Sequence, residues 1–185
     1  MICSDFFFFV VLYFSFFYLQ QANINHMWQP KGIHPPNLAL GTATAFVVVI
    51  GVLVGQWGLP RLRHQATLAS FRNIGWVGVA VMIAGVVIGI WQLSHVGYGI
   101  SSGAYSSIFF TMQTVVLVQV VIMLLWLLSL ANRAAYEAAH PIAMPAPDTD
   151  EEVATPIAAL AYSYQVGSFF LGGVVLLSWV VCYFL

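Results

Sequence analysis

Charged residues are scarce in this chain of 185 residues. Only 6% of the residues are Asp, Glu, Lys or Arg, whereas soluble domains carry about 25%. Hydrophobic residues make up 61%, so too little charge is present to cover a water-facing surface. The composition therefore predicts an integral membrane protein. With a net charge of −1, the chain also has no basic surface with which to bind nucleic acid.

Cysteine is equally scarce. Cys3 and Cys182 lie at opposite ends of the chain among apolar neighbours. Without a Cys-x-x-Cys pair, neither a zinc site nor a disulfide framework is indicated. The first residues also lack the basic group that begins a secretory signal, and Asp5 is acidic. We therefore expect the first apolar run to belong to the mature protein.

Long apolar runs account for most of the chain. A helix needs about 20 residues to cross the hydrocarbon of a bilayer. Three runs meet this length, the last run is long enough to tilt, and the first only just suffices. The sequence thus predicts an all-α fold in which residues 1–185 form a single transmembrane domain of five helices. The five predicted spans are residues 5–20, 38–59, 74–93, 108–131 and 158–185.

The first polar interruption, residues 27–36, cannot be helical. Its three prolines lack backbone N–H groups, and Gly32 adds turn freedom. Irregular backbone has no hydrogen-bond partners in lipid, so we expect this loop at a membrane surface, anchored by Trp28.

The basic residues predict the orientation. Arg61, Arg63 and Arg72 fall between the second and third predicted spans, and Arg133 follows the fourth, whereas Lys31 falls on the other side. By the positive-inside rule, the N-terminus lies in the cytoplasm and the C-terminus outside. The Pro-rich, acidic stretch 132–156 is then a cytoplasmic loop.

Small residues predict where helices pack closely. Gly51 and Gly55 form a Gly-x-x-x-Gly pair in the second span, and Gly85 and Gly89 form another in the third. Glycines at this spacing allow two helix backbones to approach.

Few residues could carry chemistry. Asp5 is the only acid inside an apolar run, and ionisable groups in membrane helices are functional candidates by default, although an acid so near the chain end is more simply an ordinary headgroup-level residue. No histidine falls in a span to ligate haem, and no nucleophile–His pair, phosphate loop or carboxylate cluster is present. We expect no catalytic, cofactor or metal residue here, and we expect the amides to form inter-helix hydrogen bonds. The amides are Gln56, Gln92, Gln113, Gln119 and Gln165, and the histidines are His26, His34, His64, His95 and His140.

Two classes of function remain open on these grounds. The chain could be a non-catalytic subunit of a larger membrane complex, or a free-standing small transporter or channel. Transporters carry buried charges or broken helices at the midplane. The predicted spans have neither, which favours the subunit.

Several motifs, in order along the chain, are similar to those of one known family. Residues 28–35 read Trp-Gln-Pro-Lys-Gly-Ile-His-Pro, similar to a Trp-Pro-Pro-x-Gly-Ile-x-Pro loop. Residues 36–42 resemble a Pro-x-Leu-Asn-Thr helix start, and Gln92 matches a Gln at the end of the third helix. Residues 103–110, Gly-Ala-Tyr-Ser-Ser-Ile-Phe-Phe, resemble a Gly-x-Tyr-Gly-Ser-x-Phe-Phe motif. Through these motifs the chain resembles subunit III of the haem-copper oxidases (the cytochrome c oxidase type) in a five-helix form.

The chain also departs from this family. Thr114, Val116 and Gln119 occupy the positions of its Gly-x-His-x-x-His, and its Tyr-Trp-His-Phe-Val-Asp is not legible in the last span. The two additional N-terminal helices of longer members are missing. The pair Ser4-Asp5 resembles the family's Ser-carboxylate pair with Asp for Glu, which raises Asp5 as a candidate proton or lipid site.

The resemblance implies a role without catalysis in this chain. The oxidase complex reduces O₂ to water with electrons from cytochrome c or quinol and pumps protons. Haem and copper belong to the partner subunits, and subunit III itself holds no redox cofactor. Its implied partners are the catalytic subunit I, subunit II, other oxidase subunits and phospholipids, in the bacterial inner (cell) membrane. An accessory protein of nitric oxide reductase, which shares this fold, is the close alternative.

Overall fold

The computed structural model of the chain describes residues 2–22, 28, 34, 36–63, 68–140 and 156–184. All regular elements in these residues are helices, and no strand occurs among them. Five are long α-helices, and two are short 3-10 turns. In chain order they are α1 (Ile2–Gln21), α2 (Leu38–Gly58), η1 (Leu59–Arg63), α3 (Leu68–Ser94), η3 (Ile100–Ser102), α4 (Ala104–Ala139) and α5 (Pro156–Phe184).

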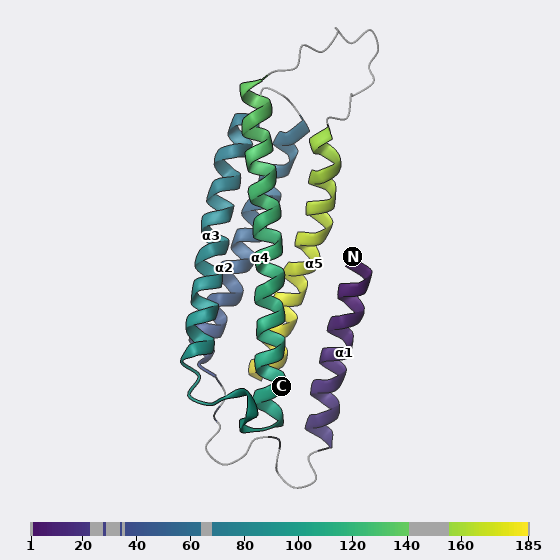
Figure 1. Cartoon of the computed structure of the whole chain (residues 1–185), viewed down its shortest axis with the longest axis vertical. Coiled ribbons are helices and arrows are strands. Elements are labelled where there is room, and N and C mark those ends of the chain that lie inside the picture. The colour runs from purple at the N-terminus through teal and green to yellow at the C-terminus, as the bar shows by residue number, and fades with distance from the viewer. Residues whose placement is uncertain are drawn as a thin grey trace.

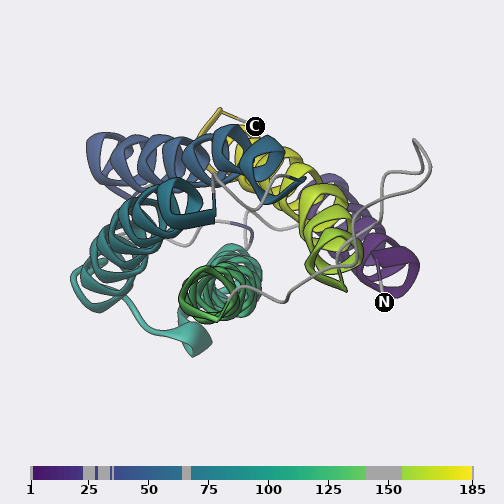
Figure 2. The same cartoon turned by 90° about the horizontal axis from the view of Figure 1, so that it is seen from above.

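Helices α2 to α5 form a bundle, and α1 lies beside it (Figure 1). Packing is most extensive between α2 and α3, α3 and α4, α4 and α5, and α2 and α5. The four helices therefore form a closed ring in which α2 faces α4 diagonally. Seen from above, α1 lies outside this ring, next to α5 (Figure 2).

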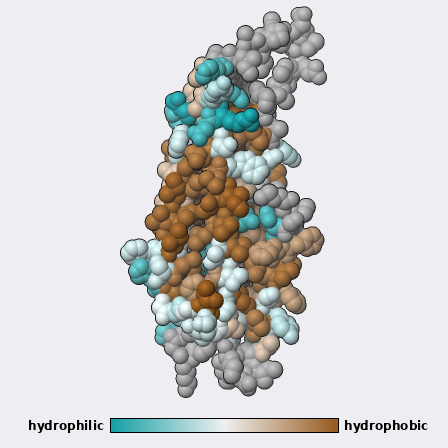
Figure 3. All heavy atoms as spheres, in the orientation of Figure 1, coloured by the Kyte–Doolittle hydropathy of each residue, from teal (hydrophilic) through white to brown (hydrophobic). Residues whose placement is uncertain are grey.

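Four helices have the length and composition of membrane spans. They cover Leu38–Leu62, Leu68–Ser94, Ala104–Ala139 and Leu160–Phe184. A broad hydrophobic band covers the middle of the molecule, with hydrophilic side chains toward one end (Figure 3). The chain is an integral membrane protein built as a helical bundle, as the composition predicts. The fifth span is not established, because the apolar part of α1, Asp5–Gln21, is shorter than the other four.

Two predicted boundaries are wrong. Helix α3 begins at Leu68, so Arg72 lies inside the helix and not in the preceding loop. Helix α4 runs for 36 residues to Ala139, so residues 132–139, predicted as loop, are helical. Alanines and Glu137 favour helix in water as well as in lipid, so the helix continues past the end of its apolar stretch.

Helix α2 begins where the polar loop ends. The side chain of Asn37 caps it, because its Oδ1 accepts a hydrogen bond from the backbone N–H of Ala39 at 2.9 Å. An Asn in this position satisfies a backbone donor that the first helical turn leaves free.

Exposed tryptophans lie near both ends of the bundle. At the end of α2, the guanidinium of Arg61 lies 4.3 Å from the ring centre of Trp57, which is 66% exposed. At the opposite end of the bundle, Trp91 stacks on His95 with the ring centres 4.4 Å apart. Exposed tryptophans paired with polar groups are typical of the boundary between lipid and water.

The arginines that the structure describes gather at one end of the bundle. Arg61 follows α2, Arg72 lies in the first turns of α3, and Arg133 lies in the last turns of α4. These three helix ends lie together, at the top of Figure 1.

Candidate functional site

Glycines bring α2 and α3 into close contact. A Cβ atom added at Gly51 would lie 2.6 Å from Cγ of Met82, and one added at Gly85 would lie 2.7 Å from Cγ2 of Val48. Real Cβ atoms do not come this close to other heavy atoms. Each glycine thus seats a side chain of the other helix, and the two backbones approach as small residues permit.

The second glycine of each pair faces a different neighbour. A Cβ at Gly55 would lie 2.5 Å from the Tyr164 hydroxyl of α5. A Cβ at Gly89 would lie 2.7 Å from Cδ2 of Leu117 in α4. The two Gly-x-x-x-Gly pairs therefore connect the whole ring, not only α2 with α3.

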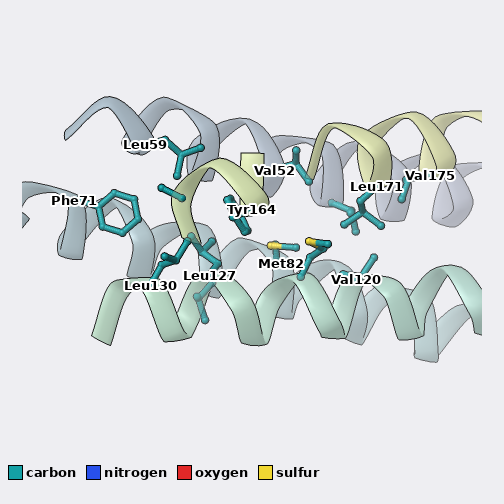
Figure 4. Packing of buried hydrophobic residues seen from close by; sticks show 14 of the residues in the cluster. Val52, Leu59, Phe71, Met82, Val120, Leu127, Leu130, Tyr164, Leu171 and Val175 are labelled. Carbon is teal, nitrogen blue, oxygen red and sulfur yellow. The ribbon is translucent and has the colours of Figure 1, made fainter. Parts of the chain in front are cut away.

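Tyr164 lies at the centre of the apolar core (Figure 4). Its side chain is fully buried, and its hydroxyl has no hydrogen-bond partner among the described residues. A buried polar group without a partner costs about 1–3 kcal/mol.

Polar side chains connect the helices within the bundle. The Gln92 amide of α3 donates to the Tyr183 hydroxyl of α5. The Gln56 amide of α2 donates to the Gln165 carbonyl oxygen of α5 at 2.9 Å, and also to the Ser168 hydroxyl. The prediction that amides form inter-helix hydrogen bonds is confirmed for Gln56 and Gln92.

A hydrogen bond also ties α1 to the bundle. The hydroxyl groups of Tyr13 in α1 and Ser178 in α5 lie 2.8 Å apart. Because Ser178 is almost fully buried, this bond joins α1 to the interior of the ring.

Trp28 fastens the other end of α1. Its side chain is only 9% exposed. Its ring lies 5.1 Å from that of Phe16 in α1 and 5.6 Å from that of Tyr105 in α4, both edge to face. The carbonyl oxygen of Trp28 accepts a hydrogen bond from the Tyr105 N–H at 3.2 Å. Trp28 is thus wedged between α1 and α4, and the location of its loop at a membrane surface stays a prediction.

Replacing Trp28 tests this attachment. We expect Trp28→Ala to lower the free energy of unfolding by about 3–5 kcal/mol, the usual cost of truncating a buried Trp. We also expect faster protease cleavage on the N-terminal side of α2. Trp57→Ala is the control, because the Trp57 side chain is mostly exposed and supports no second helix. Equal effects of the two substitutions would contradict the wedge.

An apolar groove separates α1 from α5. It has a volume of about 350 Å³, and nearly all of its lining is carbon. Gly173 contributes to it, because no atom lies within 4 Å of the place where its Cβ would be. A groove without polar partners, between two apolar helices, fits a hydrocarbon chain. It is lined by Phe6, Phe9, Val10, Tyr13, Phe169, Phe170, Gly173, Val174 and Leu177.

Asp5 lies in the first turn of α1, with its side chain half-buried. The next residue, Phe6, lines the groove, whereas Asp5 is not among the residues that line it. No group of three or more His, Cys, Asp or Glu residues that could hold a metal occurs in the described part of the chain. His34, His95 and His140 are exposed and outside the helices, whereas His26 and His64 lie outside the described residues.

Some structural residues had no sequence signal of their own. Gly41 is one, because a Cβ there would overlap the ring of Tyr183. Tyr164 and Tyr13 are others, since in the sequence each is simply an aromatic residue within an apolar run. Their importance comes from partners more than 100 residues away. Gly41 does not belong to a Gly-x-x-x-Gly pair, because the residues four positions before and after it are Asn37 and Ala45.

These features define a helical membrane protein. Four helices are long enough to span the bilayer, and a fifth, shorter apolar helix borders a hydrocarbon-lined groove. No family model matches the chain, and no curated protein matches it.

Proposed function

We propose that this chain is a non-catalytic subunit of a haem-copper terminal oxidase, of the subunit III type, that stabilises the catalytic subunit and binds phospholipid. The observation that carries the proposal is the ordered series of motifs at residues 28–35, 36–42 and 103–110. Each motif is short, but together they resemble that family's motifs, in order and with plausible spacing along the chain.

The structure supplies two supporting features. Residues in two of these motifs belong to contacts that hold the bundle together, since Trp28 packs on Tyr105 and Tyr105 donates a hydrogen bond to the Cys182 carbonyl oxygen. The groove between α1 and α5 has the shape and lining for a lipid acyl chain. Both features suit a subunit that packs on a larger complex with lipid between its helices.

The proposed setting is the bacterial inner membrane. The cluster of Arg61, Arg72 and Arg133 at one end of the bundle supports a cytoplasmic location for that end, because basic residues are retained there. The N-terminal end of α1 would then point toward the cytoplasm and the end of α5 toward the outside.

Native membranes from cells that lack this chain distinguish the proposed function from its alternatives. We expect O₂ consumption to begin at the normal rate and to fall faster during sustained turnover, because the catalytic subunit loses its stabilising partner. A change in nitric oxide reduction instead would indicate the nitric oxide reductase alternative. If neither respiration is affected, the chain is not an oxidase subunit, and the small-transporter alternative gains weight.

Asp5 provides a finer test. Asp5→Asn keeps the size of the side chain and removes its charge. If the carboxylate carries protons or fixes a lipid headgroup, we expect normal assembly but faster inactivation during sustained turnover. The measurement is O₂ consumption over many turnovers. Curves that superimpose on those of the parent protein would remove Asp5 as a functional residue.

A further inference from the structure

A small cavity lies where α2, α4 and α5 meet inside the ring. Its volume is about 20 Å³, enough for one water molecule. Much of its lining is apolar, but hydrogen-bonding side chains from all three helices also reach it. Among them are Thr44 from α2, Gln113 from α4, and Ser178 and Tyr183 from α5.

The hydroxyl of Tyr183 is left with a proton to donate. It accepts a hydrogen bond from the Gln92 amide. A tyrosine hydroxyl carries one proton as well as its lone pairs, so an acceptor is still needed on the cavity side. Ser178 has spare capacity too, because its bond to Tyr13 uses only one of its three hydrogen-bonding positions. Thr44, by contrast, donates its proton to the Leu40 carbonyl oxygen of its own helix.

Gln113 approaches the cavity from the opposite helix. Its side chain lies close to the Cys182 thiol of α5. A primary amide offers two donors and an acceptor with two lone pairs. One thiol contact therefore leaves most of its hydrogen-bonding capacity available to the cavity.

We propose that this cavity is a structural water site, in which one water molecule bridges Gln113 of α4 to Ser178 and Tyr183 of α5. The lining meets both requirements for a bound water, sufficient room and two to four polar partners. The bridge joins helices at the centre of the ring, where α2 and α4 face each other diagonally. This inference is independent of the proposed oxidase role.

The direct test is a structure of the full-length protein in lipid or detergent, at a resolution that shows ordered water. We expect a density peak in the cavity, about 2.6–3.2 Å from the Gln113 amide and from at least one of the two hydroxyl groups. A cavity with no peak, in a map that shows other buried waters, would overturn the proposal.

A pair of variants tests whether these residues hold the water. Gln113→Leu removes one partner with little change in size, and we expect the peak to disappear while the Gln92–Tyr183 bond remains. Gln119→Leu, the same change on the same helix away from the cavity lining, should leave the peak in place. A peak that survives Gln113→Leu, or that both variants abolish, would contradict the proposed bridge. If the variants do not fold, the map of the parent protein still decides the question.

Discussion

Gly55→Ala is expected to destabilise the protein by about 1–3 kcal/mol relative to a glycine replaced where there is space, which is the usual cost of overpacking a core. The added methyl group would lie 2.5 Å from the hydroxyl and 3.3 Å from two ring carbons of Tyr164. Tyr164 is fully buried in the core cluster, so its ring can move only if its neighbours move too. The measurement is the free energy of unfolding in mixed micelles, followed by tryptophan fluorescence.

The matched control is Gly173→Ala. Both changes replace a helical glycine and share the gain in helix propensity of about 1 kcal/mol. The Cβ of Gly173 would meet nothing within 4 Å, so the difference between the two variants isolates the contact with Tyr164.

Tyr164→Phe, combined with Gly55→Ala, gives a double-mutant cycle for this contact. The lost hydroxyl has no partner among the described residues, so we expect this variant to match or exceed the parent in stability. In the double variant, the atom closest to the added methyl group is removed, and most of the loss caused by Gly55→Ala should be recovered. Additive effects of the two substitutions would show that Gly55 and Tyr164 do not touch.

Gly41→Ala should have the largest effect of the single-methyl substitutions. Its Cβ would overlap the ring of Tyr183, including the ring carbon that bears the hydroxyl. The ring would have to leave its place, and the hydrogen bond from Gln92 would break with it. We expect a loss at or above the upper end of about 1–3 kcal/mol, because a rigid ring and a buried hydrogen bond are disturbed together.

Two further variants distinguish this mechanism from a general effect of alanine. Tyr183→Phe should not rescue Gly41→Ala, because the added methyl also meets ring carbons that Phe retains. Gly172→Ala should be tolerated, since its Cβ would meet only Val52 at 3.9 Å. A stable Gly41→Ala protein with the Gln92–Tyr183 bond intact would contradict the packing described at this end of the bundle.

The class of fold could be predicted because the overall composition and the lengths of the apolar runs can be read directly from the sequence. A chain with 6% charge and several long apolar runs has few ways to fold other than as membrane helices. Helix ends were harder, since α4 continues to Ala139 beyond its apolar stretch. The first apolar run only just reaches the length of a span in the sequence, and in the structure its apolar helix is shorter than the other four.

The contacts within the bundle could be predicted only in part. The Gly-x-x-x-Gly spacing indicated that Gly55 and Gly89 could lie at helix contacts, but not that they face α5 and α4. Partner identity depends on how the four helices close into a ring, which no local pattern encodes. The place of Trp28 was missed for the same reason, because a tryptophan in a surface loop and one wedged between two helices look alike in sequence.

The oxidase proposal meets its most direct test when the full-length chain, carrying an affinity tag, is purified from its native membranes in mild detergent. The measurement is the reduced-minus-oxidised absorbance spectrum, together with mass spectrometry of the accompanying subunits. The proposal predicts haem bands and a haem-copper catalytic subunit in stoichiometric amount, with the haem lost when harsher detergent strips the partners away. Purification of the chain without any haem-copper subunit, under conditions in which the oxidase stays intact, would contradict it.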